Sequence, residues 1–157
     1  MVIKLAAFDV DGVLTDGSLT FDEEGHEYKT FNAKDGQGIV NLYKAGIKTA
    51  IITARESRTV YHRAKNLRIT ELYQGVHNKL ETLQEIMKKY NLSFDETAYM
   101  GDDLPDICIL EKVKLAACPF DAVDEVKKIA GFISSKNGGR GAVRELCDKI
   151  IRETEQK

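Results

Sequence analysis

Short apolar segments alternate with amphipathic segments along nearly the whole chain. Each apolar segment is a few residues long and contains β-branched or aromatic residues, which is typical of a buried strand. The predicted strands are Ile3–Phe8, Ile47–Thr53, Glu71–Gln74, Thr97–Met100, Lys114–Ala117 and Phe132–Ser134.

Between these strands, apolar residues recur at helical spacing. The clearest run is Leu80, Leu83, Met87 and Tyr90. Further apolar faces come from residues 39–43, 60–67, 123–129 and 143–150, and Gly46 is placed to end the first of these helices. Strands that alternate with helices of this length predict an α/β fold with a doubly wound, mostly parallel sheet and a Rossmann-like core.

Residues 18–32 interrupt this alternation. Leu19 and Phe21 alternate with polar residues, an acidic turn ends in Gly25, and a second extended stretch follows around Tyr28–Phe31. The pattern predicts a β-hairpin inserted directly after the first strand. A lone two-stranded ribbon cannot bury these apolar side chains, so we expect the hairpin to dock against other subunits. The alternative is a hairpin folded over its own sheet.

Composition restricts the class of protein. The chain has 157 residues, 43% of them hydrophobic and 31% charged, with a formal net charge of −2. We therefore expect one domain spanning residues 1–157 and no affinity for nucleic acid or for a membrane surface. No apolar run approaches the ~20 residues of a membrane span, and "MVIKLAAFDV" lacks the features of a signal peptide. Cys108, Cys118 and Cys147 form no C-x-x-C pair, which favours free thiols and a cytoplasmic location.

Polar residues follow several of the predicted strands. Asp9 and Asp11 follow the first strand, Thr53 ends the second, and "GDDLPD" follows "ETAYM". Lys79 falls in the first turn of the helix around Leu83. Because the carboxyl ends of parallel strands meet at one edge of a sheet, we expect these side chains to form one site.

These residue types suit phosphoryl transfer. A carboxylate such as Asp9 can attack phosphorus and form an aspartyl-phosphate, and Asp11 can protonate the leaving oxygen and then deprotonate water. Carboxylates this close favour Mg²⁺, while a threonine hydroxyl and a lysine ammonium can bind the phosphoryl oxygens. Each piece alone also has a structural explanation, such as a turn, a surface lysine or a helix cap at Asp103. Their joint occurrence favours a site.

The segments "DVDGVLTDG", "IITAR", Lys79 and "GDDLPD" occur in this order over nearly the whole chain. This set resembles the haloacid dehalogenase-like phosphatase superfamily. The resemblance implies Asp9 as nucleophile and Asp11 as general acid and base. It implies Mg²⁺ ligands at Asp9, at the backbone carbonyl of Asp11 and at Asp102. It places Asp106 and Asp103 behind these ligands, with Asp106 orienting Lys79 or a metal-bound water.

The short spacing between these segments leaves no room for a cap domain. Together with "KDGQGI", "NKLETL" and "GGRGAVRE", the set is similar to the 3-deoxy-D-manno-octulosonate 8-phosphate (KDO 8-phosphate) phosphatase family. That resemblance implies hydrolysis of this sugar phosphate to KDO and phosphate in lipopolysaccharide synthesis. It also implies a homotetramer in which a neighbouring subunit closes the site.

Such a substrate also carries a carboxylate, which an arginine can bind in bidentate fashion. The basic candidates are Arg55, Arg63, Arg140 in the glycine-rich "NGGRG", expected to be flexible, and Lys34 beside a turn at Gly36 and Gly38. The helix start expected at "DGQGI" offers free N–H groups as a further anion site. Ala54, where related sequences often have glycine, and Glu56 leave the substrate identity open.

Three alternatives remain at this point. One is a phosphatase for a sialic-acid-like nine-carbon sugar 9-phosphate. Another is a non-catalytic assembly module of the same fold, against which the intact set of Asp9, Asp11, Lys79 and Asp102 argues. The last is a receiver domain of a signalling relay, whose acceptor aspartate lies later in the chain.

Overall fold

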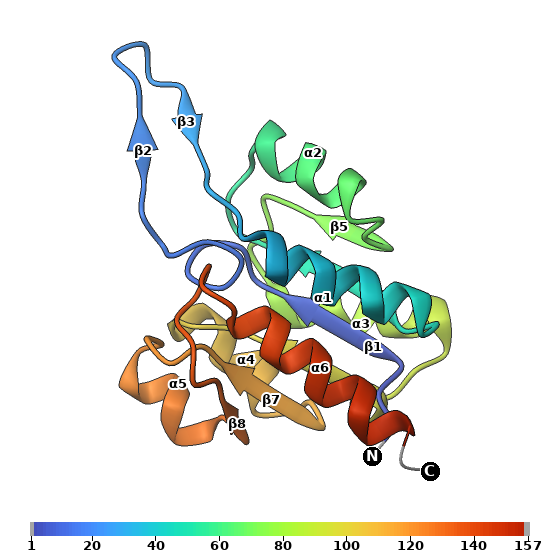
Figure 1. Cartoon of the computed structure of the whole chain (residues 1–157). Coiled ribbons are helices and arrows are strands. Elements are labelled where there is room, and N and C mark those ends of the chain that lie inside the picture. The colour runs from blue at the N-terminus through green and yellow to red at the C-terminus, as the bar shows by residue number, and fades with distance from the viewer. Residues whose placement is uncertain (1, 156–157) are drawn as a thin grey trace.

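The computed structural model describes residues 2–155, which contain one six-stranded parallel sheet. Its strand order is β5-β4-β1-β6-β7-β8 (Figure 1). The first strand pairs with β4 on one side and with β6 on the other, so that Ala7 lies opposite both Ala50 and Tyr99. The chain order reverses at β1, and ligands of such sheets bind beyond the carboxyl ends at this reversal. The strands are β1 Leu5–Phe8, β4 Lys48–Ile52, β5 Glu71–Tyr73, β6 Thr97–Met100, β7 Leu115–Cys118 and β8 Phe132–Ile133.

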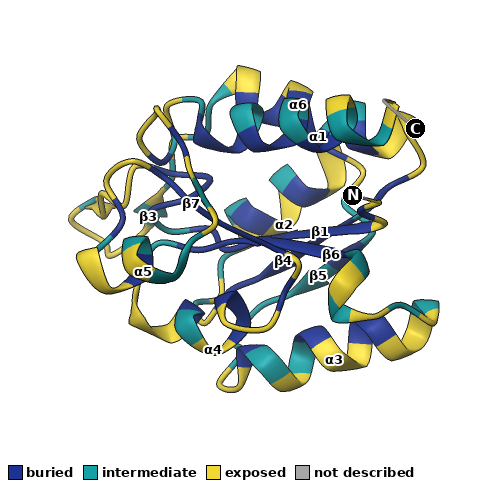
Figure 2. Cartoon of the chain, turned by 90° about the horizontal axis from the view of Figure 1, so that it is seen from below, coloured by how far each residue is buried: buried dark blue, intermediate teal, exposed yellow. Residues whose placement is uncertain are grey.

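Helices cover both faces of the sheet, as the alternation of strands and helices predicts (Figure 2). Side chains of α1, α2 and α6 pack on one face with Ala6 and Phe8 of β1, and those of α3, α4 and α5 pack on the other with Leu5 and Ala7. Burial on both faces explains why the strands are continuous apolar runs. The helices are α1 Ala33–Lys44, α2 Arg58–Asn66, α3 Lys79–Tyr90, α4 Ile107–Leu110, α5 Asp124–Ile129 and α6 Ala142–Glu155, with 3₁₀ turns at Phe94–Glu96 and Leu104–Asp106.

The start of α1 differs from the expectation. The helix begins at Ala33, and the Asn32 side chain accepts hydrogen bonds from the N–H groups of Lys34 and Asp35. The prediction of free N–H groups at "DGQGI" is therefore wrong, because these residues lie inside a helix that is already capped. Gly36 and Gly38 are likewise helical and form no turn. A Cβ atom on Gly38 would come within 3.1 Å of the Arg144 backbone, so glycine here permits close packing of α1 on α6.

The predicted hairpin is present and projects away from the sheet (Figure 1). It pairs β2, Thr20–Phe21, with β3, Glu27–Tyr28, in antiparallel orientation. The alternative of a hairpin folded over its own sheet is wrong, because Leu19, Phe21 and Tyr28 remain 57%, 53% and 59% exposed. Phe31 differs from these three, since it packs against the core of its own chain.

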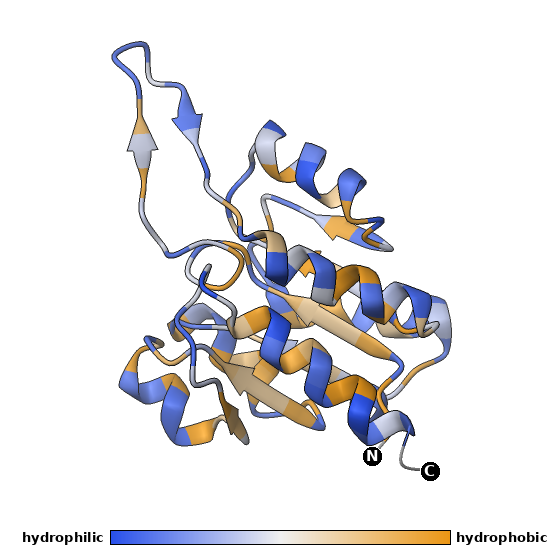
Figure 3. Ribbon diagram, viewed as in Figure 1, coloured by the Kyte–Doolittle hydropathy of each residue, from blue (hydrophilic) through white to orange (hydrophobic). Residues whose placement is uncertain are grey.

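Most of the other apolar residues lie in the sheet and on the inner faces of the helices (Figure 3), although a few, such as Tyr61, Leu104 and Phe120, are exposed. No cap domain covers the strand ends within residues 2–155. Over the same residues, no helix is long and apolar enough to cross a membrane.

Candidate active site

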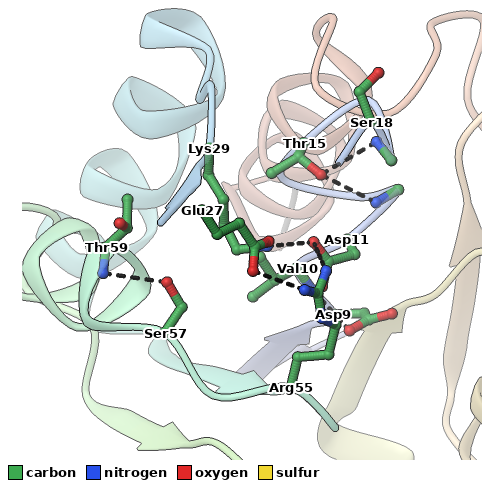
Figure 4. A network of polar contacts seen from close by, with 12 residues as sticks. Asp9, Val10, Asp11, Thr15, Ser18, Glu27, Lys29, Arg55, Ser57 and Thr59 are labelled. Carbon is green, nitrogen blue, oxygen red and sulfur yellow. Dashed lines mark hydrogen bonds and ion pairs between the residues drawn. The ribbon is translucent and has the colours of Figure 1, made fainter. Parts of the chain in front are cut away.

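The loop after β1 begins the site. Three successive N–H groups, from Val13 to Thr15, converge on the carbonyl oxygen of Val10, so the chain turns tightly after Asp9. The Thr15 hydroxyl accepts hydrogen bonds from the N–H groups of Gly12 and Gly17, both at 3.2 Å (Figure 4). Gly12 has a φ of +85°, a conformation that glycine adopts without strain. This tight loop carries Asp9 and Asp11 at the carboxyl end of the central strand.

A cleft of about 240 Å³ lies beyond the strand ends. Residues from four separate parts of the chain surround it, as the strand-end rule predicts. Thr53 is buried directly after β4, next to two of the lining residues. The lining residues are Asp9, Asp11, Ala54, Arg55, Lys79, Asp102, Asp103, Pro105 and Asp106.

Lys79 is the first residue of α3, and its side chain contacts the carboxylates of Asp9 and Asp106. Its Nζ atom lies 2.8 Å from Asp106 Oδ1 and 3.2 Å from Asp9 Oδ1. Burial lowers the pKa of the ammonium, but the two carboxylates outweigh that effect and raise the pKa overall. The lysine is therefore charged at neutral pH and can bind an anion as well as order the acids around it.

Asp106 is fully buried, and both of its oxygens are occupied. Oδ1 accepts hydrogen bonds from Lys79 and from the Tyr99 hydroxyl at 2.6 Å. Oδ2 accepts them from the N–H groups of Asp102 and Asp103 at 3.0 and 3.2 Å. Asp106 thus orients Lys79 and fixes the loop that carries Asp102. The Asp103 carboxylate is an exposed cap, because its Oδ1 accepts the Leu104 N–H at 2.7 Å.

The carboxylates suit a divalent cation. One oxygen each of Asp9, Asp102 and Asp106 lies within 4.8 Å of the others, and Asp102 Oδ1 is buried without a hydrogen-bond partner among residues 2–155. Burial and the nearby Asp106 raise the pKa of Asp9 to about 7. Burial and the charges of Asp9 and Asp106 raise the pKa of Asp102 to about 8. A cation with oxygen ligands would relieve this repulsion and satisfy the buried oxygen.

Gly12 makes the approach of Asp102 possible. A Cβ atom at position 12 would lie 1.9 Å from Asp102 Oδ2. Any other residue would displace this carboxylate from the loop that carries Asp9 and Asp11. The glycine of "DVDG" therefore serves both the turn and the distance between the acidic groups.

Comparisons with known proteins show the family of the chain. A family model described as haloacid dehalogenase-like hydrolase matches residues 68–146. The KDO 8-phosphate phosphatase KdsC of Escherichia coli K12 is 42% identical over 149 residues, which is 95% of this chain and 79% of that protein. The chain belongs to the haloacid dehalogenase-like phosphatases.

Solved structures of this family superpose closely on the chain. A probable YrbI family phosphatase from Pseudomonas syringae has a TM-score of 0.96 and 46% identity, covering 98% of this chain and 87% of its own. The KDO 8-phosphate phosphatase of Moraxella catarrhalis, in complex with magnesium ion, phosphate ion and KDO, has a TM-score of 0.95 and 39% identity, covering 98% and 88%. The protein is thus an enzyme, a phosphatase that resembles KdsC.

Of the four basic residues that the sequence offered for binding a carboxylate, Arg55 lines the cleft. Arg63 donates to the Asn32 carbonyl and lies over the Phe31 ring, away from the lining residues. Lys34 and Arg140 line a separate depression at the start of α6. Within one chain, the fold therefore brings one of the four candidates to the acidic residues.

The segment "NGGRG" is packed, although we expected it to be flexible. The Gly139 N–H donates to the Val13 carbonyl at 3.0 Å, and a Cβ atom on Gly138 would lie 1.9 Å from the Gly12 carbonyl oxygen. The two glycines therefore support the loop that carries Asp11. This packing directs Arg140 outward, where it is 69% exposed and lies 3.5 Å from Asp16.

Asp16 belongs to the turn, as the sequence indicates, since its Oδ1 accepts the Ser18 N–H at 2.9 Å.

Two residues at the cleft escaped the sequence analysis, Glu27 and Lys29 of the hairpin. Lys29 Nζ lies 2.6 Å from Asp11 Oδ1 and 2.8 Å from Glu27 Oε1. Their spacing of two residues in an extended strand, which directs both side chains to one face, was a signal in the sequence.

Proposed function

We propose that this phosphatase hydrolyses KDO 8-phosphate to KDO and phosphate, with Mg²⁺ and through a phosphorylated Asp9. The observation that carries the proposal is the cleft in which Asp9 and Asp11 meet Lys79 and the unsatisfied carboxylate of Asp102. Identity of 42% to KdsC and the superposition on a relative that holds magnesium, phosphate and KDO support the same reaction.

Asp9, Asp102 and the backbone carbonyl of Asp11 would hold the metal ion, while Asp106 keeps Lys79 and the Asp102 loop in place. When bound, Mg²⁺ would neutralise the acidic groups and polarise the phosphate. The Lys79 ammonium and the Thr53 hydroxyl would donate hydrogen bonds to the phosphoryl oxygens, where negative charge must be stabilised.

The reaction has two displacement steps. An Asp9 carboxylate oxygen attacks phosphorus, the bond from phosphorus to the sugar oxygen breaks, and Asp11 gives its proton to that oxygen. Asp11 then takes a proton from water as the water oxygen attacks phosphorus and the bond to Asp9 breaks. Inorganic phosphate leaves, and both carboxyl groups return to their starting states.

We infer that Arg55 binds the sugar carboxylate, because it lines the cleft and its side chain is 40% exposed. A bidentate contact from its guanidinium would select acidic sugars.

Substrate selectivity tests this proposal. We expect kcat/KM for KDO 8-phosphate to exceed that for glucose 6-phosphate at least about 100-fold, since binding groups left without their partner discriminate strongly. A nine-carbon sugar acid 9-phosphate belongs in the same comparison. A flat profile across the three esters would contradict the substrate assignment, and absence of all hydrolysis would contradict the phosphatase mechanism.

The exposed hairpin carries a second part of the proposal. A capless cleft needs another means to exclude water, and Leu19, Phe21 and Tyr28 form an apolar surface that pairing with other copies would bury. We infer a homotetramer in which a neighbouring subunit closes the cleft.

Sedimentation equilibrium measures this assembly. The expected mass is about four times the 17.6 kDa of one chain. Phe21→Glu places a charge in the buried contact and should yield smaller species with reduced kcat/KM. Tyr43→Glu, at an exposed residue near the end of α1, is the matched control and should leave the assembly intact. A monomeric wild-type protein would refute the closure by a neighbour.

A further inference from the structure

The base of the hairpin contacts Asp11 and Arg55, two residues that line the cleft. Figure 4 shows Glu27, Lys29, Asp11 and Arg55 converging, although they come from three separate segments. Lys29 Nζ lies 2.6 Å from Asp11 Oδ1 and 2.8 Å from Glu27 Oε1. Arg55 contacts the other Glu27 oxygen at 2.7 Å and lies 3.9 Å from Asp11 Oδ1. The four charges alternate in sign around a closed ring.

Lys29 is unlike an ordinary surface lysine. Its side chain is 2% exposed, whereas the side chain of His26, which contacts Asp22 in the same hairpin, is 66% exposed. A buried ammonium is costly unless its partners satisfy it, and removal of one partner leaves an uncompensated charge. Lys29 therefore occupies a position where a neutral apolar side chain would avoid that cost.

The contacts to Asp11 are one-sided. Both Lys29 and Arg55 approach Oδ1, and within residues 2–155 no hydrogen bond goes to Oδ2. A carboxyl group held at one oxygen presents the other in a defined direction. A hydrogen bond from an ionised donor such as the Lys29 ammonium is short and strong, so Oδ1 is held whether or not Oδ2 carries a proton.

We propose that Lys29 is a positioning residue that aims the Asp11 carboxyl group at the leaving oxygen, an inference that rests on the proposed function. Lys29 holds Oδ1, and Oδ2 carries the proton that passes to the sugar oxygen as the bond from phosphorus to that oxygen breaks. Lys29 itself transfers no proton. Glu27 fixes the distance between Lys29 and Arg55, so the hairpin that faces other subunits also shapes the acid-base site.

Two substrates with different leaving groups distinguish this positioning role from a purely structural role of Lys29. A sugar alcohol is a poor leaving group and needs the proton from Asp11, whereas nitrophenolate leaves without it. The quantity to measure is kcat/KM, because it reports the steps up to departure of the leaving group and not the later hydrolysis of phospho-Asp9. For Lys29→Met we expect kcat/KM for KDO 8-phosphate to fall about 100-fold, and that for p-nitrophenyl phosphate to fall less than about fivefold.

Three further variants complete the test. Lys29→Arg should restore most of the activity. Lys88→Met, at an exposed lysine in the last turn of α3, should leave kcat/KM unchanged for both esters. If Lys29→Met does not fold, the double variant K29M/E27Q keeps the local charge unchanged and should show the same selective loss. Circular dichroism melting confirms that each compared protein is folded.

Several results would overturn the inference. Equal losses for both esters would show a structural role alone, and unchanged kinetics would show no role. Wild-type selectivity between the esters in K29M/E27Q would show that charge balance and not orientation matters. A wild-type protein that hydrolyses neither ester would contradict the proposed function itself.

Discussion

Asp9→Asn is expected to abolish phosphate release, with kcat reduced at least about 10⁴-fold. The carboxylate of Asp9 supplies the oxygen that attacks phosphorus, and a carboxamide is a far weaker nucleophile. The variant should fold, because asparagine retains the oxygen that accepts the Val10 N–H and removes a buried charge. The measurements are phosphate release and the mass of acid-quenched enzyme, in which wild-type protein alone should carry a phosphoryl group.

Asp16→Asn is the matched control for this variant. It removes a carboxylate from the same loop, but Asp16 lies in the turn that begins the hairpin and outside the cleft. Its activity should remain within a few-fold of wild type, as for substitutions away from reacting groups. Phosphate release by Asp9→Asn at the wild-type rate would rule out Asp9 as the nucleophile.

Asp102→Asn is expected to change activity and stability in opposite directions. Loss of this carboxylate removes a metal ligand, so activity and Mg²⁺ affinity should fall at least about 100-fold. The metal-free variant should nevertheless be more stable than metal-free wild type at neutral and alkaline pH. At alkaline pH the folded wild type carries a buried Asp102 charge repelled by Asp9 and Asp106, and at neutral pH Asp102 must take up a proton on folding to avoid that charge; asparagine removes both costs.

The dependence on pH follows from the raised pKa. The pKa of Asp102 is about 8 in the folded chain against a usual value of 3.8, and that of Asp9 is about 7. From the usual pKa of 3.8 up to the raised values, the folded state binds more protons than the unfolded state. The free energy of unfolding therefore falls as pH rises through this range. The stabilising effect of Asp102→Asn should therefore be small near pH ~4 and largest above pH ~8, where this carboxyl is ionised.

Thermal unfolding in a chelator, and then in excess Mg²⁺, measures both effects. For a chain of this size, each kcal/mol of stability shifts Tm by about 2–4 °C. Excess Mg²⁺ should raise the Tm of wild type but not that of Asp102→Asn. Asp95→Asn, at an exposed residue of the 3₁₀ turn before β6, should show neither the stability gain at alkaline pH nor the loss of the Mg²⁺ response. A lower Tm for metal-free Asp102→Asn at alkaline pH would contradict the repulsion argued here.

Much of the fold was predictable because both faces of the sheet are buried. Runs such as Leu5–Phe8 and Leu115–Cys118 are apolar and buried at every position, and amphipathic helices between them leave a parallel sheet as the consistent arrangement. The start of α1 was less predictable. Asn32 caps the helix ahead of two glycines that resemble a turn in sequence, and only packing against α6 shows why a helix tolerates them.

The acidic part of the site was predictable for a similar reason. Carboxyl ends of parallel strands meet at one edge, so residues after different strands, such as Asp9 and Asp102, can be placed together without knowing any distance. The basic part was not predictable. Arg55, Arg63 and Arg140 are long side chains on loops or helices, and their directions depend on neighbours such as Phe31 and Asp16.

By itself, the sequence determined which types of functional residue follow one another along the chain. These are two aspartates after the first strand, a threonine, a lysine at a helix start, and a final acidic loop. Periodicity and residue type are local properties, and they suffice for this. The tertiary structure alone decided that Gly12 admits the Asp102 carboxylate and that Gly138 packs behind the loop of Asp11. It also decided that Lys29 of the hairpin reaches Asp11. These are contacts between segments distant in sequence, and their geometry is set by how the layers pack.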